Sequence, residues 1–399
     1  MNKIKFFAQE ASYYSAIVRP MLRYKCIPFK ETTYGGKIFS RFFEKSGSVQ
    51  LPQIETPDGK VIQDSTIICD YLESKYPEKS MIPQTPIQLM LAKIIQEFAN
   101  DFMILPAMHY RWNFKRTNWR ICYYEFAKLA VPDYLFFLRP FIAINITPRI
   151  EMAYRKMGGL DEDFLPEIEQ WYLDFLEKLN NHFLHHHYLF GDKPSIADCA
   201  LMGPLYAHLG RDAYPKKLMK KVAPKVSEWV LRMNQPDRTD TDFMPHDIIP
   251  ETLIPVLDII FKSQGPKTKA VIKKTDEYMN LVSDRNQLFR RMSGKIEFKL
   301  GQYVGLRPAE IHVAWLRQKT LHEYDQLSEN NKKLVKEFLA LHDWLEFFDI
   351  RLKQPIKRVR NKYYHYDADE TIVVQRDLYI NQGAFSGGKK ARRESLENK

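Results

Sequence analysis

The tripeptide Pro57-Asp58-Gly59 limits the fold of the N-terminal region more than any other feature, because it separates two short strand-like runs. Residues 51–55 and 60–63 flank it, and a turn of this composition between two such runs is typical of a β-hairpin. From Thr66 to Tyr76 the apolar side chains take helical spacing. A ββα unit is therefore expected, and Pro77 ends its helix because proline cannot continue one.

Three segments upstream of this unit indicate a strand, a helix and a strand. Residues 3–8 have the pattern of a buried strand, residues 16–24 that of an amphipathic helix and residues 29–33 that of a second strand, with a loop between residues 33 and 51. Residues 1–80 therefore combine a βαβ unit with a ββα unit, which is the thioredoxin-like order of elements. The fold class expected for this region is α/β.

Prolines separate this region from a second one that has only helical patterns. Pro83 and Pro86 cannot continue regular structure, so a linker is expected between residues 80 and 87. Apolar residues then recur at steps of three and four from residue 87 onward, and again over residues 165–183 and 196–209. Residues 87–234 are therefore expected to form an all-α domain. Within it, Ser195 and Asp198 have the spacing of a helix capping box.

The remaining residues predict a mainly helical extension and a tail. Residues 235–242 are polar and unpatterned, which indicates a loop. Over residues 250–380, helical spacing occurs in segments 253–261, 310–324 and 332–348, while residues 295–300 alternate as in a strand. Residues 381–399 are basic and almost free of apolar groups, so a disordered tail is expected. No motif in the extension indicates its role.

The charge of the chain indicates an affinity for anions without selecting one. The 399 residues carry a formal net charge of +11, which attracts nucleic acid, acidic membrane or a small anionic ligand. Basic residues gather in segments 353–364 and 389–393, and the first of these is interleaved with aromatic residues, as in some phosphate-binding surfaces. A solvated basic face is the simpler interpretation. Nucleic-acid binding is not expected, because no recognised motif for it is present.

Composition and motif spacing argue against several other classes. The apolar stretches fall short of the roughly 20 residues that a membrane-spanning helix needs, and the N-terminus lacks the apolar core of a signal peptide, so a cytoplasmic location is expected. The four cysteines are scattered, which predicts neither a zinc site nor a redox pair. No metal is expected at His185-His186-His187 either, because consecutive residues point in different directions on a helix.

The residues that flank the predicted hairpin have chemistry suited to a peptide ligand. Pro52 can turn the loop back so that the N–H and C=O of Leu51 pair with an extended peptide, as an added strand does. Asp64 and Ser65 precede a helix whose N-terminal N–H groups favour a carboxylate, while Asp64 can bind an ammonium. A γ-glutamyl group carries both charges. The simpler interpretation is that Asp64-Ser65 is only an N-cap and Pro52 only a loop proline.

These features occur together in one family. The thioredoxin-like order, Pro52, Asp64-Ser65, a proline-rich linker and a capping box in an all-α domain are combined in the cytosolic glutathione transferase superfamily, which this chain resembles from residue 3 to residue 234. In particular, it resembles the long members that carry Met-His-Tyr-Arg-Trp after the first long helix, here residues 108–112, and an extra C-terminal region. The resemblance implies that Leu51, Pro52, Asp64 and Ser65 bind glutathione as a substrate.

The resemblance also places a catalytic hydroxyl at the start of the first helix. Serine-type members carry a motif such as Ser-x-x-Ser-x-x-Val-Arg there, and residues 12–19 of this chain match it, which assigns the role to Ser12. A donated hydrogen bond would stabilise the glutathione thiolate, with help from the helix dipole. Tyr13 and Tyr14 are adjacent donors that could take the role instead. Pro20 falls inside this helix, and Ser12 could also be a plain N-cap.

The family places its electrophile pocket on the first helices of the second domain, which assigns His109, Tyr110, Arg111 and Trp112 as candidates. The function implied is an enzyme that activates glutathione for attack on a small apolar electrophile, and the usual assembly in the family is a homodimer. The alternative is a non-catalytic binding or scaffold protein that uses the extension of residues 250–380 to hold a partner.

Overall fold

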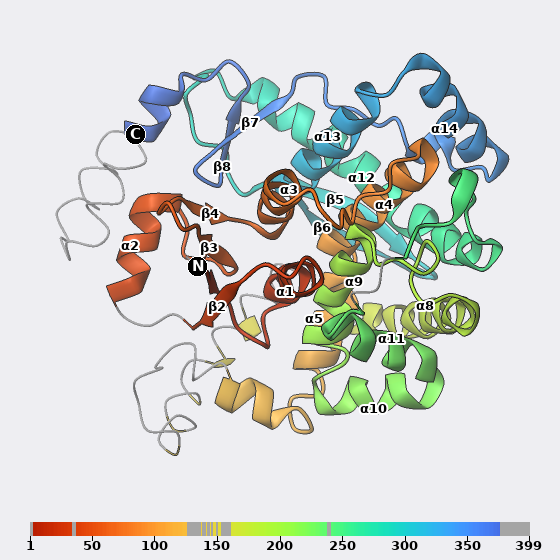
Figure 1. Cartoon of the computed structure of the whole chain (residues 1–399). Helices are drawn as coiled ribbons and strands as arrows, with labels where there is room; N and C mark the ends of the chain where they lie inside the picture. Colours follow the sequence, from red (N-terminus) through yellow and green to blue (C-terminus); the bar gives the residue numbers. More distant parts are fainter. Residues whose placement is uncertain are drawn as a thin grey trace.

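The computed structural model describes residues 3–33, 37–125, 161–237 and 241–375, together with isolated positions between 126 and 160. Its N-terminal part contains a four-stranded sheet with the order β2-β1-β3-β4 (Figure 1). The strands are β1 (Ile4–Phe7), β2 (Phe29–Thr32), β3 (Gln53–Glu55) and β4 (Val61–Gln63). Strand β1 runs parallel to β2 and antiparallel to β3, which pairs with β4 across the predicted hairpin. The thioredoxin-like order of elements is confirmed.

Side chains of this sheet point alternately to its two faces and pack against helices on both of them. Phe6 faces the main hydrophobic core together with residues of α1 (Tyr13–Tyr24) and α3 (Ser65–Lys75), whereas its neighbour Phe7 packs against Phe42 of α2. The two rings of this second pair lie 4.3 Å apart. Successive residues of a strand point to opposite faces, so one strand supplies both layers.

The helix α2 (Lys37–Ser46) occupies a segment for which the sequence predicted only a loop, and that prediction is wrong. The helix is short, and its end is marked by Gly47, whose φ of +75° is in the left-handed region that glycine adopts readily. The N–H of Gly47 donates to the carbonyl oxygen of Phe43 at 2.9 Å, as in a helix C-terminal cap. Packing on Phe7 stabilises this short helix in addition to its own hydrogen bonds.

The second region is all-α, as expected. Its helices are α4 (Pro86–Asp101), α5 (Ile104–Trp112), the π-helical turn η1 (Arg120–Glu125), the short 3-10 helix η3 (Glu162–Phe164), α8 (Leu165–His185), α9 (Ile196–Ala207), α10 (Ala213–Val222) and α11 (Pro224–Asn234). Helix α9 lies at the centre and packs against both α1 and α4. The capping box at its start is confirmed, because Ser195 accepts from the Asp198 N–H and Asp198 accepts from the Ser195 N–H.

A buried histidine in α8 gives this domain a predictable sensitivity to acid. Burial lowers the pKa of His182 to about 3, and its ring contacts the Thr252 hydroxyl and the Tyr188 carbonyl oxygen. The unfolded chain therefore binds a proton that the native protein does not between pH 6.5 and about 3. This contribution to stability is fully present above pH 6.5 and is lost as the pH falls through that window.

We expect the free energy of unfolding of His182→Gln to depend less on pH in the acidic range than that of the unsubstituted protein. A difference of one bound proton between the unfolded and native states corresponds to about 1.4 kcal/mol per pH unit. As the pH is lowered, the free energy of unfolding of the unsubstituted protein should therefore fall more steeply than that of His182→Gln by that amount. Urea unfolding at pH 6.5, 5.5 and 4.5 measures both slopes. Parallel slopes for the two proteins would contradict the assignment.

The extension is mainly helical, as expected, and also contains two hairpins. Its elements are the short 3-10 helices η4 (Pro245–Asp247), η5 (Glu251–Leu253) and η6 (Leu345–Phe347), the helices α12 (Ile254–Leu281), α13 (Ile311–Asp325) and α14 (Glu329–Leu341), and the strand pairs β5 (Met292–Leu300) with β6 (Tyr303–Glu310) and β7 (Ile356–Val359) with β8 (Lys362–His365). The strand predicted at residues 295–300 is part of β5. The predicted tail at 381–399 lies outside the described residues.

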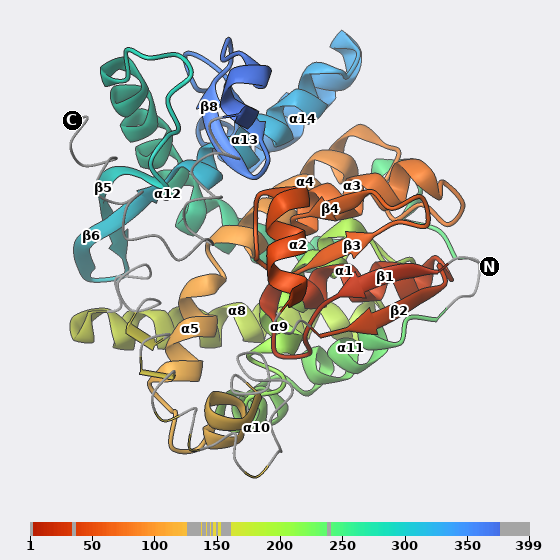
Figure 2. The same cartoon turned by 90° about the vertical axis from the view of Figure 1, so that its left-hand side faces the viewer.

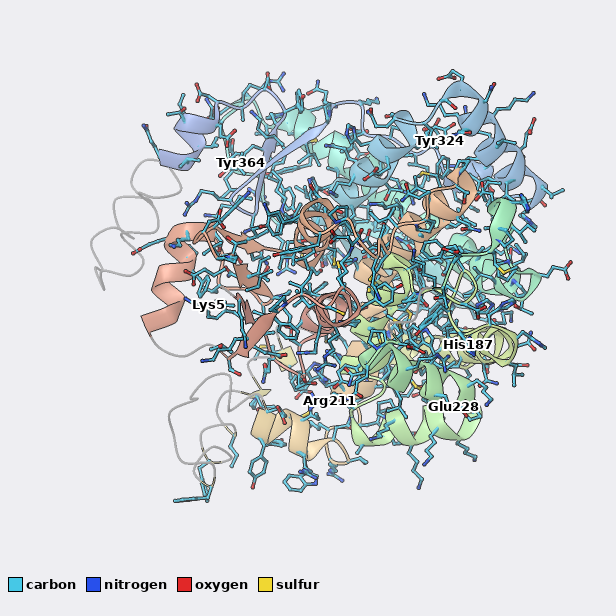
Figure 3. The ribbon with its side chains drawn as sticks, in the orientation of Figure 1. Lys5, His187, Arg211, Glu228, Tyr324 and Tyr364 are labelled. Atoms are coloured by element: carbon cyan, nitrogen blue, oxygen red, sulfur yellow. The ribbon has the colours of Figure 1, made fainter. Side chains whose placement is uncertain are left out.

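Ion pairs attach the extension to the first two regions. Arg317 of α13 contacts Glu97 of α4 with 3.0 Å between Nη2 and Oε1, and both side chains are buried. Lys319 of the same helix pairs with Asp70 of α3 at 2.5 Å. Figure 2 shows α13 and α14 above α3 and α4, with α12 beside the β5–β6 hairpin. In Figure 3 the labelled Tyr324 and Tyr364 of the extension lie on the opposite side from Arg211 and Glu228 of the all-α region. Within the described part of the chain, no helix combines the length and apolarity needed to cross a membrane.

Candidate functional site

The strand register brings the predicted site segments to one edge of the sheet. Phe7, at the end of β1, lies opposite Gln53, and Gln53 lies opposite Gln63 at the end of β4. The loop that follows β1, the Leu51-Pro52 segment before β3 and Asp64 after β4 therefore all leave the sheet at the same edge. The peptide bond between Leu51 and Pro52 is cis. Segments that are far apart in the sequence thus meet at one place.

Asp64 caps the helix α3 and has an unusual backbone conformation. One of its carboxylate oxygens, Oδ1, accepts hydrogen bonds from the N–H groups of Thr66 at 2.9 Å and Ile67 at 3.4 Å. Its φ of +87° is uncommon for a residue other than glycine, and such outliers often mark functional positions. Ser65 follows as the first residue of the helix and is buried. Asp64 is therefore the N-cap of α3, and its second carboxylate oxygen, Oδ2, takes no part in the capping.

The second oxygen of Asp64 is paired with an arginine from the far end of the chain. Nη2 of Arg358, on β7, lies 2.9 Å from Oδ2, and the two side chains are 10% and 13% exposed. Burial would raise the pKa of Asp64, but the charges of Arg358 and His312 together with the hydrogen bonds to the carboxylate hold it below its ordinary value. Asp64 is therefore a carboxylate that already has a cationic partner.

The three candidate hydroxyls at the start of α1 differ in what they contact. Tyr13 is buried and donates its hydroxyl to the carbonyl oxygen of Ala99 on α4, and burial raises its pKa well above the ordinary value. Tyr14 donates toward the carbonyl oxygen of Asn100 at 3.5 Å. Ser12 accepts from the Ser15 N–H at 3.3 Å, and its own proton is donated to no group among the described residues. Ser12 thus keeps a donor available, whereas both tyrosines point toward α4.

An arginine predicted for the electrophile pocket supports the loop before Ser12. Nε and Nη2 of Arg111, on α5, bind both carboxylate oxygens of Asp212 at 2.7 and 2.8 Å. Nη1 donates to the carbonyl oxygen of Ala11 at 3.2 Å, in the residue next to Ser12. Both charged side chains are almost completely buried. Arg111 therefore connects α5 to the sheet edge from within the core.

The other three residues of that group are also buried in the all-α region. Nε2 of His109 contacts Oε1 of Glu169 at 2.8 Å, and Tyr110 packs against the ring of Tyr172, while Trp112 lies within the main core. Burial raises the pKa of Tyr110 above its ordinary value. These contacts give all four residues a structural role. Their assignment to an electrophile pocket stays a prediction.

Sequence reasoning missed the contribution of the extension to this site. Arg358 lies in the segment described as basic and aromatic, but nothing in its spacing relates it to Asp64, and β7 and β8 were not predicted as strands. Trp315 was placed on a helix by its pattern, yet its ring lies 4.3 Å from the Arg358 guanidinium carbon. The β-branched and aromatic residues Val359, Tyr363 and Tyr364 on the two sides of Arg360-Asn361 were the one available signal of strands.

Comparisons with known families give matches in two separate segments. The model of the glutathione S-transferase N-terminal domain matches residues 6–80, and that of the C-terminal domain matches residues 149–237. Among curated proteins, glutathione S-transferase omega-1 of Sus scrofa is 34% identical over 59 residues, which are 15% of this chain and 24% of that protein. The same protein of Rattus norvegicus is 38% identical over 56 residues, or 14% and 23%. The chain thus spans about a quarter of the length of these curated relatives.

Solved structures give broad but distant alignments. A beta-etherase from Sphingobium sp. strain SYK-6 aligns at 18% identity and a TM-score of 0.42, covering 66% of this chain and 100% of that one. A glutathione S-transferase from Methylobacterium radiotolerans, solved in complex with glutathione sulfonate, aligns at 16% identity and a TM-score of 0.36, covering 61% of this chain and 99% of that one.

Proposed function

Because this chain belongs to the glutathione transferase superfamily, we propose that it binds glutathione at the sheet edge and activates the thiol of this substrate for attack on a small apolar electrophile. The observation that supports the proposal is that the loop before Ser12, the Leu51-Pro52 segment and Asp64 leave the sheet at the same edge, within the segment that matches the N-terminal domain of the family. Each of the three supplies one interaction that glutathione requires.

In this proposal the two ends of the ligand are bound by different groups. The N–H and C=O of Leu51, held by Pro52, pair with the peptide backbone of glutathione in the manner of an added strand. Ser65, through its hydroxyl and its own backbone N–H at the start of α3, binds the α-carboxylate of the γ-glutamyl residue, and Asp64 binds its ammonium. These groups supply recognition, and the reacting sulfur lies toward Ser12.

Ser12 acts on the thiolate in this mechanism. The thiol loses its proton to solvent, and the Ser12 hydroxyl donates a hydrogen bond to the resulting anion, which makes the thiolate more abundant near neutral pH. The thiolate then forms a carbon–sulfur bond with the electrophile, and the leaving group departs with the electron pair of the bond that breaks. The Ser12 hydroxyl donates to no group among the described residues, which supports this role over Tyr13 and Tyr14, whose hydroxyls point toward α4.

We expect Ser12→Ala to lower kcat/KM for glutathione with a generic aryl halide by about 100-fold at pH 7, the usual cost of removing one donor to a reacting anion. The pH at which activity rises should also move upward, because the thiolate loses a stabilising hydrogen bond and the pKa of the thiol therefore rises. Tyr13→Phe and Tyr14→Phe are matched controls and should stay within a few-fold of the unsubstituted enzyme. An unchanged Ser12→Ala enzyme would contradict the role of this serine.

A second candidate is a glutathione transferase-like binding protein without catalysis. The observation in its favour is the ion pair between Arg358 and Asp64, which commits part of the proposed site to the extension. Retention on immobilised glutathione followed by the aryl halide assay separates the two candidates. Binding without turnover favours the second, and failure to bind glutathione contradicts both. A homodimer and a cytoplasmic location stay predictions.

A further inference from the structure

We propose that the β7–β8 hairpin is a displaceable cover on the proposed glutathione site, in which Arg358 occupies the position on Asp64 that the ammonium of the γ-glutamyl group takes when the ligand binds. This inference rests on the proposed function, since it concerns the same site. Binding of a ligand with a free α-ammonium is then coupled to release of a C-terminal hairpin that lies 294 residues away in sequence from Asp64.

The first support is the way in which Asp64 is used. Oδ1 is committed to the N–H groups of Thr66 and Ile67, and Oδ2 to Arg358, while the carboxylate side chain is 13% exposed. A ligand ammonium therefore reaches Oδ2 only if the guanidinium leaves. The exchange is neutral in charge, because one cation replaces another on the same carboxylate. Asp64 keeps a cationic partner in both states.

The second support is that the Arg358 contact satisfies only part of the guanidinium. Nη2 donates to Asp64 and to Oδ1 of Asn361 at 2.8 Å. Among the described residues, Nε and Nη1 are buried and have no hydrogen-bond partner, and the guanidinium lies against the Trp315 ring. Burying N–H donors without acceptors costs free energy, which the cation–π contact offsets only in part. The interaction is therefore weaker than a fully bonded arginine would give.

The third support is the set of contacts between the hairpin turn and the end of α2. Arg360 and Asn361 have φ values of +48° and +62°, as expected for a two-residue turn between antiparallel strands. Nη2 of Arg360 donates to the carbonyl oxygens of Phe43 and Glu44, and Nδ2 of Asn361 donates to that of Ser46, all at the end of α2. Backbone carbonyls at a helix C-terminus lack donors within the helix, so the turn caps those of Glu44 and Ser46 and shares that of Phe43 with the Gly47 N–H.

Gly47 allows the hairpin turn to approach the end of α2 closely. A Cβ atom at position 47 would lie 2.4 Å from the carbonyl oxygen of Arg360, and the φ of +75° already disfavours any other residue. The hairpin therefore rests on a backbone position that only glycine accommodates. A substitution there lifts the turn without touching Ser12, Asp64 or Arg358.

Binding of glutathione to the unsubstituted protein and to three arginine variants tests the proposal by calorimetry at fixed pH and ionic strength. We expect Arg358→Ala to bind glutathione about tenfold more tightly, which corresponds to a cover that is open about a tenth of the time in the unsubstituted protein. Arg358→Lys keeps a cation on Asp64 and should fall between the two. Arg351→Ala removes an exposed arginine of the same extension and serves as the matched control.

Hydrogen exchange of the β7–β8 amides supplies the second measurement. Glutathione should accelerate their exchange in the unsubstituted protein, and Arg358→Ala should show fast exchange without ligand. Gly47→Ala should reproduce both effects, so the test does not depend on one variant.

Three outcomes decide the matter. Weaker glutathione binding by Arg358→Ala would show that Arg358 contacts the ligand, and unchanged binding by both Arg358→Ala and Gly47→Ala would show that the hairpin does not compete; either result overturns the cover while the proposed function stands. If glutathione binds to no variant, although hydrogen exchange shows the hairpin released, the proposed function itself fails and the cover fails with it.

Discussion

Asp212→Ala is expected to lower the free energy of unfolding by about 3–5 kcal/mol, because it leaves the guanidinium of Arg111 buried without its counter-charge. The two side chains are 1% and 0% exposed, and Arg111 makes two parallel hydrogen bonds to the carboxylate. A buried charge that loses its partner keeps the full cost of its removal from water. Urea or thermal unfolding of the full chain measures the loss.

The matched control is Asp325→Ala, which removes an arginine partner at the surface. Asp325 binds Arg351 at 2.9 Å with the same two-pronged geometry, but the side chains are 47% and 41% exposed. Exposed pairs contribute about 0–1 kcal/mol, so this variant should unfold near the unsubstituted protein. Equal losses in the two variants would mean that burial does not determine the effect, contrary to our account of Arg111.

Asp198→Ala is expected to cost about 4 kcal/mol, because one buried carboxylate serves several donors at the start of α9. Its oxygens accept from the N–H of Leu189 at 3.1 Å, from the N–H and hydroxyl of Ser195 at 2.9 and 2.6 Å and from Nε1 of Trp229 at 3.1 Å. Alanine leaves these buried donors without an acceptor. The loss should therefore exceed that of an ordinary capping residue.

Ser328→Ala is the appropriate comparison for this prediction. Ser328 caps α14 by accepting from the Asn331 N–H, and it is exposed, so water replaces the lost acceptor. A loss of about 1 kcal/mol is expected for such a cap. Chemical unfolding of the two variants gives the difference, and a loss at Asp198 no larger than that at Ser328 would refute the special role of the buried carboxylate.

Elements specified by local patterns were predictable from the sequence, and elements that depend on docking were not. The turn at residues 57–59 and the apolar spacing of residues 66–76 act within a few residues of each other, which is why β3, β4 and α3 were expected near their observed bounds. The helix α2 was missed because part of its stability comes from packing on Phe7. The hairpin β7–β8 was missed because a basic, aromatic segment has the same composition on a solvated surface.

The candidate site divides in the same way. Asp64 and Ser65 were recognisable because the start of a helix has a local chemical signature. The resemblance assigned the catalytic role to Ser12, but Tyr13 and Tyr14 stayed open because all three are adjacent hydroxyls. Our proposal of Ser12 draws on the carbonyl oxygens of Ala99 and Asn100 at the end of α4, which receive the two tyrosines. The contact between Arg358 and Asp64 has no local sequence signal, because the two residues are 294 positions apart.

The ion pair between Glu97 and Arg317 has a consequence for where this protein ends as a folding unit. The family match stops at residue 237, yet Glu97 lies within the preceding region and has its cationic partner on α13. A chain cut after the matched segment would keep the carboxylate and lose the guanidinium, together with the apolar surface that covers α4. The boundary of sequence similarity is therefore not a boundary of packing, because one hydrophobic core includes residues on both sides of it.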